Sequence, residues 1–184
     1  MFFFSGCHNL KKIIGISNFD TTNVIYMRCM FAECYELVYL NLFSFITSKV
    51  IDLAGMFLNC YKLKQIIGLN NFNTANVTTM VGMFQLCKKL EYLYLNNFDT
   101  SNVTNMEFMF SSCYKLKEIN GINNFNTIKV NNMYSMFTCC NELKNIDLSN
   151  FNTSNATDMS YMFAGCNKLK EIKGINKFNI DKNI

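Results

Sequence analysis

Cysteine is the residue type in this chain that could most readily support chemistry. The 184 residues include nine cysteines, and seven of them recur at steps of 26 or 27 residues. A zinc site needs closely spaced cysteines or histidines, and a nucleophilic cysteine needs a neighbouring base. The single histidine is His8, and no two cysteines have the Cys-x-x-Cys spacing. We therefore expect no bound metal and no thiol-based catalysis.

Disulfide bonds do not explain the cysteine spacing either. Cys29 and Cys139 fall outside the regular set, and an odd total cannot pair completely within one chain. Cysteines on adjacent strands of a stack would lie about 4.8 Å apart, but with parallel side chains whose Cβ atoms are badly placed for a bond. We expect Cys60, Cys87 and Cys113 to be buried, unbonded side chains that serve packing.

Carboxylates could still form a catalytic pair if the fold brought two of them together. Four occupy expected strand segments, namely Glu91, Glu118, Asp147 and Glu171. Exposed strand charges ordinarily keep a protein soluble, and the glycines are scattered singly, so the chain has no phosphate-binding loop. Because no group of residues supplies a nucleophile and its base together, we expect that the protein is not an enzyme and uses no cofactor.

Charge and hydropathy exclude two classes of interaction. The net charge of +4 comes from 17 basic and 13 acidic residues, without the dense basic runs that nucleic-acid binding uses. No segment approaches the ~18 consecutive apolar residues of a membrane-spanning helix. A chain of this length with 50% hydrophobic residues can bury one sizeable core. We expect no nucleic-acid partner, no membrane span and a single domain.

The regular cysteines mark a sequence repeat that extends over the whole chain. They are Cys7, Cys34, Cys60, Cys87, Cys113, Cys140 and Cys166. Their period is typical of arrays in which one small unit stacks on the next. The longer units carry an extra glycine, as at Gly15 and Gly68, which indicates a bulge. We expect residues 1–184 to form one solenoid of about seven repeats, partial at both ends, that is a fragment of a longer array.

Each repeat contains two apolar patterns. Before the cysteine, as between Val103 and Cys113, apolar residues have the spacing of one helical face. After the cysteine, a Leu-x-x-Leu segment such as 90–93 indicates a short strand in register with its neighbours. Asx-Thr pairs such as Asp99-Thr100 are expected to cap the following helix. The predicted fold is an α/β repeat solenoid, leucine-rich-repeat-like, with one short parallel strand and one short helix per unit of 26 or 27 residues.

The repeat resembles a known family. One unit runs Phe98-Asp99-Thr100-Ser101-Asn102-Val103-Thr104-Asn105-Met106 and then Met109-Phe110-Ser111-Ser112-Cys113. This pattern is similar to the leucine-rich-like repeats of BspA-type bacterial surface proteins, and all of the units keep it. The resemblance implies a leucine-rich-like solenoid of the kind found in surface lipoproteins and adhesins of bacteria and in surface proteins of some protists.

Outward positions on the expected strands are candidates for binding. A strand in a stacked sheet points alternate side chains outward, and these positions fall five and seven residues after each cysteine. In the middle repeats they carry side chains of the kind enriched at interface centres, namely Tyr39, Ile67, Tyr92 and Tyr94. The alternative is chance decoration by a tyrosine-rich sequence, since single exposed aromatic residues are common.

These features predict a non-catalytic protein-interaction or adhesion module that binds a protein or other macromolecule, such as a host or matrix component, through the solenoid surface. The family resemblance implies a cell-surface or secreted location. The alternative is an intracellular, cytoplasmic scaffold of leucine-rich-like repeats, which is favoured by nine cysteines without evident disulfide pairing.

Overall fold

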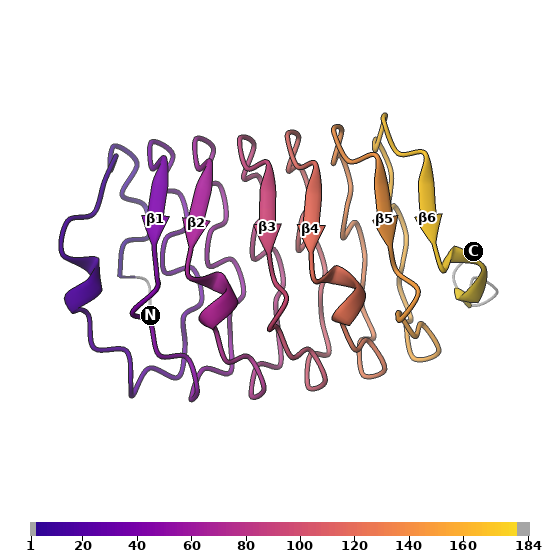
Figure 1. Ribbon diagram of the computed structural model, residues 1–184, viewed down its shortest axis with the longest axis horizontal. Coiled ribbons are helices and arrows are strands. Elements are labelled where there is room, and N and C mark those ends of the chain that lie inside the picture. The colour runs from indigo at the N-terminus through magenta and orange to yellow at the C-terminus, as the bar shows by residue number, and fades with distance from the viewer. Residues whose placement is uncertain (1–2, 180–184) are drawn as a thin grey trace.

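The computed structural model describes residues 3–179, in which the chain winds through successive coils of similar shape that lie side by side along one axis (Figure 1). Each coil after the first contributes one short strand, and the strands all lie on one side of the stack. They are β1 (Tyr39–Asn41), β2 (Gln65–Ile67), β3 (Tyr92–Tyr94), β4 (Glu118–Asn120), β5 (Asn145–Asp147) and β6 (Glu171–Lys173). The short parallel strands predicted from the sequence are confirmed.

The strands pair in parallel, but only two at a time. β1 pairs with β2, β3 with β4 and β5 with β6, and Leu93 lies opposite Ile119 in the register. Within residues 3–179, no backbone hydrogen bond joins β2 to β3. The strands that the repeat places in one register are therefore divided into three pairs.

The glycine that lengthens every second repeat accounts for this pairing. Each such glycine precedes a short 3-10 helix, and these are η1 (Ile16–Asn18), η2 (Leu69–Asn71), η3 (Ile122–Asn124) and η4 (Ile175–Lys177). Gly68 has a left-handed φ of 93°, and a Cβ atom there would lie 2.4 Å from the backbone nitrogen of Phe43 in the preceding coil. Glycine alone tolerates both this φ and this close approach. The coil that carries the glycine therefore packs tightly on the coil before it.

The expected short α-helix does not occur: among the residues that the structure describes, the only helices are the four 3-10 turns, so this prediction is wrong. Consecutive tight turns take its place. Between Met106 and Cys113, the Met109 N–H donates to the Met106 carbonyl at 3.1 Å. Phe108 and Ser112 have left-handed φ values of 56° and 59°. The apolar spacing fits these turns as well as a helix, because both return to the same face after three or four residues.

Hydrogen bonds between coils decide against the helix. A helix uses its N–H groups within one segment. Here the Phe108 N–H donates to Tyr134 of the next coil at 3.0 Å, and the Phe110 N–H to Met136 at 2.9 Å. Isolated parallel bridges continue along this side of the stack through Tyr26, Asp52, Thr79, Asn105, Asn132 and Asp158. Bonding to neighbouring coils thus overrides the local preference for a helix.

The Asx-Thr residues act between coils, and not as the helix caps that the sequence predicted. The Asp99 carboxylate accepts a hydrogen bond from the Ser101 N–H at 2.9 Å, which forms a local turn. The buried Thr100 hydroxyl donates to the Asn126 carbonyl of the next coil at 2.9 Å. The same bond recurs at Thr21, Thr47, Thr74 and Thr127. The neighbouring coil therefore satisfies the hydroxyl groups of these buried threonines.

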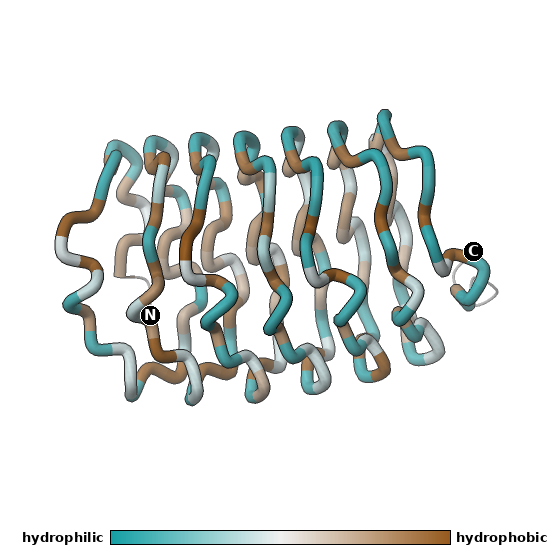
Figure 2. The backbone as a smooth tube through the Cα atoms, in the orientation of Figure 1, coloured by the Kyte–Doolittle hydropathy of each residue, from teal (hydrophilic) through white to brown (hydrophobic). Residues whose placement is uncertain are grey.

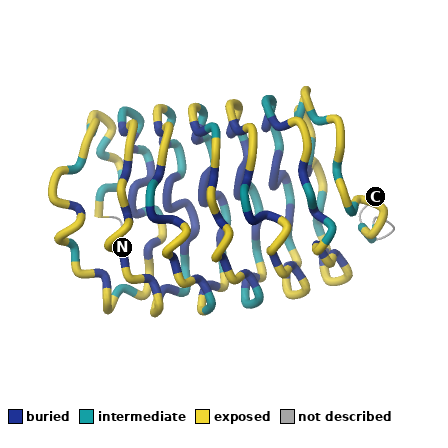
Figure 3. The backbone as a smooth tube through the Cα atoms, in the orientation of Figure 1, coloured by how far each residue is buried: buried dark blue, intermediate teal, exposed yellow. Residues whose placement is uncertain are grey.

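The core consists of ladders of equivalent side chains along the stack. Hydrophobic positions recur at the same place in successive coils in Figure 2, and Figure 3 shows these inner positions as buried while the two end coils are mostly exposed. Phe84, Phe110 and Phe137 are fully buried, and their successive ring centroids lie 5.7 and 5.4 Å apart. Stacked rings at such distances attract one another in addition to burying apolar area.

The regular cysteines form one of these ladders. Cys60, Cys87 and Cys113 are buried and free, in agreement with the sequence prediction. Each thiol donates to a phenylalanine carbonyl of the preceding coil, and for Cys87 the acceptor is Phe57, 3.2 Å away. Burial raises the pKa of Cys113 to about 12. Because the thiolate is the reactive form, the ladder serves packing and not chemistry.

Candidate binding surface

The outward strand positions lie where the repeat predicts them. The first and third residues of β3 flank a buried central leucine. The exposed fraction is 42% for Tyr39, 45% for Tyr92 and 56% for Tyr94. Ile67, the third residue of β2, is half-buried. All four candidate residues therefore lie on the strand side of the stack.

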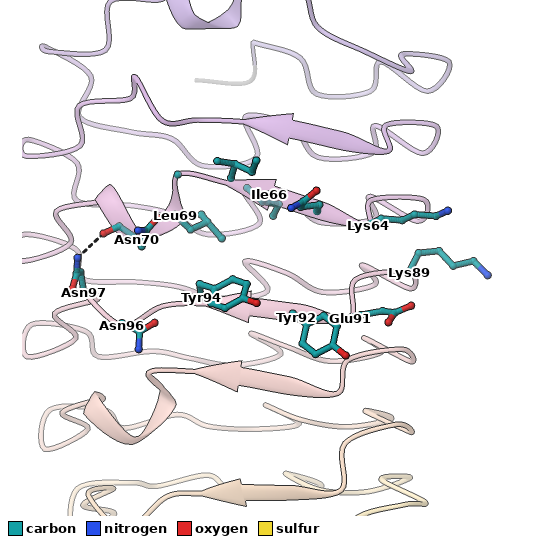
Figure 4. Close-up of a pocket in the computed structure, with 13 residues that line it drawn as sticks. Lys64, Ile66, Leu69, Asn70, Lys89, Glu91, Tyr92, Tyr94, Asn96 and Asn97 are labelled. Carbon is teal, nitrogen blue, oxygen red and sulfur yellow. Dashed lines mark hydrogen bonds between the residues drawn. The ribbon is translucent and has the colours of Figure 1, made fainter.

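Three of the four candidates line one hollow between β2 and β3 (Figure 4). Ile67 comes from β2. Tyr92 and Tyr94, which are labelled in Figure 4, come from β3. Leu69, at the start of η2, adds to the apolar lining of this hollow, whose volume is about 710 Å³. Concave apolar surface edged by a few polar groups is the usual form of a binding site.

Tyr39 lies outside this hollow. It belongs to β1, where it pairs with Gln65 of β2, and Gln65 itself lines the hollow. Tyr39 therefore lies next to β2, the strand that forms one wall of the hollow. The sequence could not separate it from the other three residues, because all of them occupy equivalent outward positions.

The hollow exists because the strand pairs are separate. β2 has its strand partner on the β1 side, and β3 has its partner on the β4 side. Gly68 brings its coil against Phe43 of the coil before. At the next junction, no hydrogen bond within the described residues joins β2 to β3. The hollow opens at this junction.

One end of the hollow is positively charged. Lys64 and Lys89 line it, and neither forms a salt bridge with any residue in the described range. Glu91 lies in the same lining, but its carboxylate accepts a hydrogen bond from Lys117 at 2.6 Å. This hydrogen bond, together with the charge of Lys117, lowers the pKa of Glu91. Glu91 thus has its own cationic partner.

The other end of the hollow is edged by amide side chains. Asn70, Asn96 and Asn97 line it, and the Asn97 Nδ2 donates to the Asn70 carbonyl at 2.7 Å. An asparagine side chain can both donate and accept hydrogen bonds. This end can therefore bond polar groups of either kind.

The sequence did not identify these lysines and asparagines. They flank the strands and do not occupy the outward positions that the repeat singled out. A signal was present, because Gly15, Gly68 and Gly121 are spaced by 53 residues. That spacing marks every second junction, which is where the hollows lie.

A second hollow lies at the equivalent junction between β4 and β5, with a volume of about 630 Å³. Asn145 and Asp147 occupy the places that Tyr92 and Tyr94 have at the first junction. Tyr92 of β3 also lies in the lining of this second hollow. The backbone arrangement of the hollow is therefore repeated, whereas the pair of tyrosines on one strand is not.

A family of Mycoplasma proteins of unknown function, DUF285, matches residues 1–91 and again residues 85–183. The chain belongs to this family. The DUF285 match covers both halves of the chain and confirms the resemblance to BspA-like repeats. No curated protein matches the sequence.

Two solved structures resemble the DUF285 chain over part of their length. A leucine-rich repeat protein from Bacteroides ovatus is 19% identical with a TM-score of 0.47, and the likeness covers 87% of this chain and 45% of that protein. A leucine rich cell surface protein from Faecalibacterium prausnitzii is 18% identical with a TM-score of 0.22, covering 78% and 61%. The DUF285 chain thus spans less than two thirds of either protein.

Among residues 3–179, no three His, Cys, Asp or Glu side chains are grouped so that they could hold a metal ion. The same residues include no helix with the length and apolar character needed to cross a membrane. What the hollow between β2 and β3 offers a ligand is apolar area, two ammonium groups and several amides.

Proposed function

We propose that this chain is a non-catalytic protein-interaction or adhesion module of a cell-surface protein, and that it binds a macromolecular partner through the strand side of a solenoid. The observation that carries the proposal is the hollow where Ile67, Tyr92 and Tyr94 present apolar area to solvent. Tyrosine is enriched at interface centres because it combines a large apolar ring with a polar hydroxyl. Tyr39 extends this area onto β1.

The distribution of exposed apolar side chains supports the same surface. Ile14 and Phe43, which precede the hollow in the sequence, are 86% and 67% exposed. The outward positions of β4 to β6 are polar or charged instead, and they are Glu118, Asn120, Asn145, Asp147, Glu171 and Lys173. Exposed apolar area that is concentrated in one region marks interaction sites. We place the contact with the partner in the N-terminal half of the strand side.

The titratable groups of the hollow favour binding over catalysis. A general acid needs a carboxyl pKa raised toward neutrality. The pKa of Glu91 is lowered instead, because Lys117 donates a hydrogen bond to it. The Glu91 carboxylate is thus held in its ionised form. The same hydrogen bond raises the pKa of Lys117, so both partners stay charged.

The proposed location follows from the BspA-like repeat, which occurs in bacterial surface proteins. Nine cysteines favour the alternative of an intracellular scaffold, because exposed thiols oxidise outside the cell. The structure weakens this objection. Cys60, Cys87 and Cys113 are buried, and burial raises the pKa of their thiols, so the reactive thiolate is scarce.

Adhesion of protein-coated beads tests the proposed function. Beads that carry the chain are expected to adhere to cultured host cells or to immobilised matrix proteins. The triple substitution Tyr39→Ala, Tyr92→Ala and Tyr94→Ala is expected to abolish adherence. Asn145→Ala with Asp147→Ala is the matched control, because it truncates equivalent positions at the polar hollow. Equal adherence of the wild type and of a triple variant shown by circular dichroism to be folded would refute the proposed site.

Protease treatment of intact cells separates the two locations. A surface module is expected to be cleaved from cells that keep their cytoplasmic proteins, whereas an intracellular scaffold is protected until the cells are lysed. Immunoblots with an antibody against the chain and one against a cytoplasmic protein give the readout. Protection of the chain in intact cells, followed by cleavage after lysis, would favour the scaffold.

A further inference from the structure

We propose that the hollow between β2 and β3 binds an extended acidic peptide segment of a partner protein. An apolar side chain of the segment packs on Ile67, Tyr92 and Tyr94, and a nearby carboxylate lies between Lys64 and Lys89. The inference rests on the proposed function, because it names the kind of partner that the same site accepts.

The charge around the hollow favours an acidic partner. Lys64 and Lys89 line it without a salt bridge to any residue in the described range. Glu91 is the acidic residue of the lining, and Lys117 of the next coil lies 2.6 Å from its carboxylate. Lys64 also attracts Glu91, but together with Lys117 the three lysines around this end outnumber its one carboxylate. Complementary charge speeds encounter with a partner and fixes its register.

The second hollow shows that this charge balance is particular to the first. The lining between β4 and β5 mixes three acidic and three basic residues, which are Glu118, Asp147, Glu171, Lys117, Lys144 and Lys173. It carries Asn145 and Asp147 at the places that Tyr92 and Tyr94 have in the first hollow, and Tyr92 is the one tyrosine in its lining. A site with equal numbers of both charges does not select an acidic ligand, so the hollow between β4 and β5 serves as an internal comparison.

The order of side chains along the first hollow fits an extended chain. In Figure 4 the lysines lie at one end, Tyr92 and Tyr94 follow, and the asparagines lie at the other end. An extended peptide points alternate side chains to one face, about 6.6 Å apart. An acidic and an apolar side chain two residues apart can therefore both face the hollow. The amides of Asn96 and Asn97 can bond the peptide backbone, which adds affinity that is independent of its sequence.

Fluorescence polarisation with labelled hexapeptides tests the inference on the full chain. The first peptide set carries aspartates two residues from a leucine or a phenylalanine, and matched sets replace the aspartates by serine or by lysine. The variants are Lys64→Glu with Lys89→Glu, and Tyr92→Ala with Tyr94→Ala. Lys170→Glu with Lys173→Glu changes the net charge equally at β6 and is the control.

The acidic set is expected to bind best, and more weakly as salt is raised. Lys64→Glu with Lys89→Glu should weaken its binding roughly ten-fold, and the β6 control by less than about two-fold. Tyr92→Ala with Tyr94→Ala should abolish binding of every set.

Equal binding of acidic and lysine peptides would overturn the inference, as would no effect of Lys64→Glu with Lys89→Glu. The proposed function would still stand after either result if the triple variant with Tyr39→Ala, Tyr92→Ala and Tyr94→Ala loses adherence in the bead assay. Absence of all peptide binding, together with oligosaccharide binding that depends on Tyr92 and Tyr94, would identify a glycan ligand and refute the peptide. Peptide binding that survives the tyrosine substitutions would refute the site itself.

Discussion

The two sides of the stack are built differently from the same repeats. On the side that carries the methionines, parallel bridges continue through each junction from Tyr26 to Asp158, and the buried phenylalanine rings lie 5.4 to 5.8 Å apart. On the strand side the strands pair two by two, and the rings that follow them, such as Phe98 and Phe125, lie 6.5 Å apart. Close stacking on the side of the parallel bridges holds the coils together. The strands on the opposite side can therefore separate at some junctions, where hollows form.

Under the proposed function, this difference separates stability from recognition. The closely stacked side buries its side chains and bonds its backbone to the next coil, so substitutions there affect folding. The strand side displays two hollows of the same backbone design with different linings, Tyr92 and Tyr94 in one and Asn145 and Asp147 in the other. Outward residues can therefore change at each junction while the core stays the same.

The largest expected effect comes from pH acting on the thiol ladder of the close side. Its five buried members are Cys34, Cys60, Cys87, Cys113 and Cys140. Burial raises the pKa of Cys113 from the ordinary 9.0 to about 12. Between these values the unfolded chain loses the thiol proton and the folded chain keeps it, so stability is full below pH 9 and falls as the pH rises.

In this pH window each such thiol lowers the free energy of unfolding by about 1.4 kcal/mol per pH unit. Thermal unfolding measured from pH 7 to pH 10.5 should therefore show a steep fall of Tm above about pH 9. The variant Cys87→Ala lacks one titrating group and should show a shallower fall. A Tm that stays constant across the window would contradict the buried, protonated ladder.

The next largest effect is that of a core phenylalanine compared with an exposed tyrosine. Phe110→Ala opens a cavity between two stacked rings and should lower the free energy of unfolding by about 3–5 kcal/mol. Tyr94→Ala removes an aromatic ring of similar size from the strand side and should change it by less than about 0.5 kcal/mol. Urea denaturation of both variants gives the comparison. Similar losses would mean that the two sides contribute alike to stability.

A smaller effect is expected at the glycines that lengthen every second repeat. Gly15→Ala places a Cβ atom in nearly open space, so its cost is that of a left-handed alanine, about 1–2 kcal/mol. Gly68→Ala has the same conformational cost and also meets the Phe43 backbone nitrogen at 2.4 Å. This clash should add about 1–3 kcal/mol. Equal losses in urea denaturation would show that the close approach of the coils is not needed.

The smallest effect on stability is expected from the candidate binding residues. The triple substitution Tyr39→Ala, Tyr92→Ala and Tyr94→Ala truncates exposed side chains and should leave Tm within a few degrees of the wild type, because exposed substitutions seldom change stability by more than about 0.5 kcal/mol each. Calorimetry checks this. A large loss would mean that the tyrosines hold the strands in place and are not free for a partner.

Much of the architecture could be predicted from the sequence. The period of the cysteines located the coils, and the Leu-x-x-Leu segments located each of the six strands to within two residues, so that Tyr39, Ile67, Tyr92 and Tyr94 do fall at the first or third position of a strand. The prediction succeeded because alternation along a strand is a local property of the backbone. Burial of Cys60, Cys87 and Cys113 was predicted for a similar reason, since identical positions in stacked units share one environment.

The helix prediction failed for a reason that is not local. The segment from Val103 to Cys113 has a helical apolar spacing, but every second N–H group from Met106 to Ser112 bonds to the next coil. Phe108 takes a left-handed φ of 56° in this arrangement. A left-handed conformation costs a non-glycine residue about 1–2 kcal/mol. Only the presence of a stacked neighbour supplies the hydrogen bonds that offset this cost, and a single repeat gives no information about them.

The sequence by itself thus determined the repeat, the strands, the side chains that point outward and the family to which the chain belongs. The tertiary structure alone decided that the strands pair by twos, that hollows open after the coils of Gly68 and Gly121, and that Lys64, Lys89 and the asparagines flank Ile67, Tyr92 and Tyr94. The physical reason is distance along the chain. The hollow joins residues about one repeat apart, and how closely two coils approach depends on contacts such as that of Gly68 with the Phe43 backbone, which exist only in the stack.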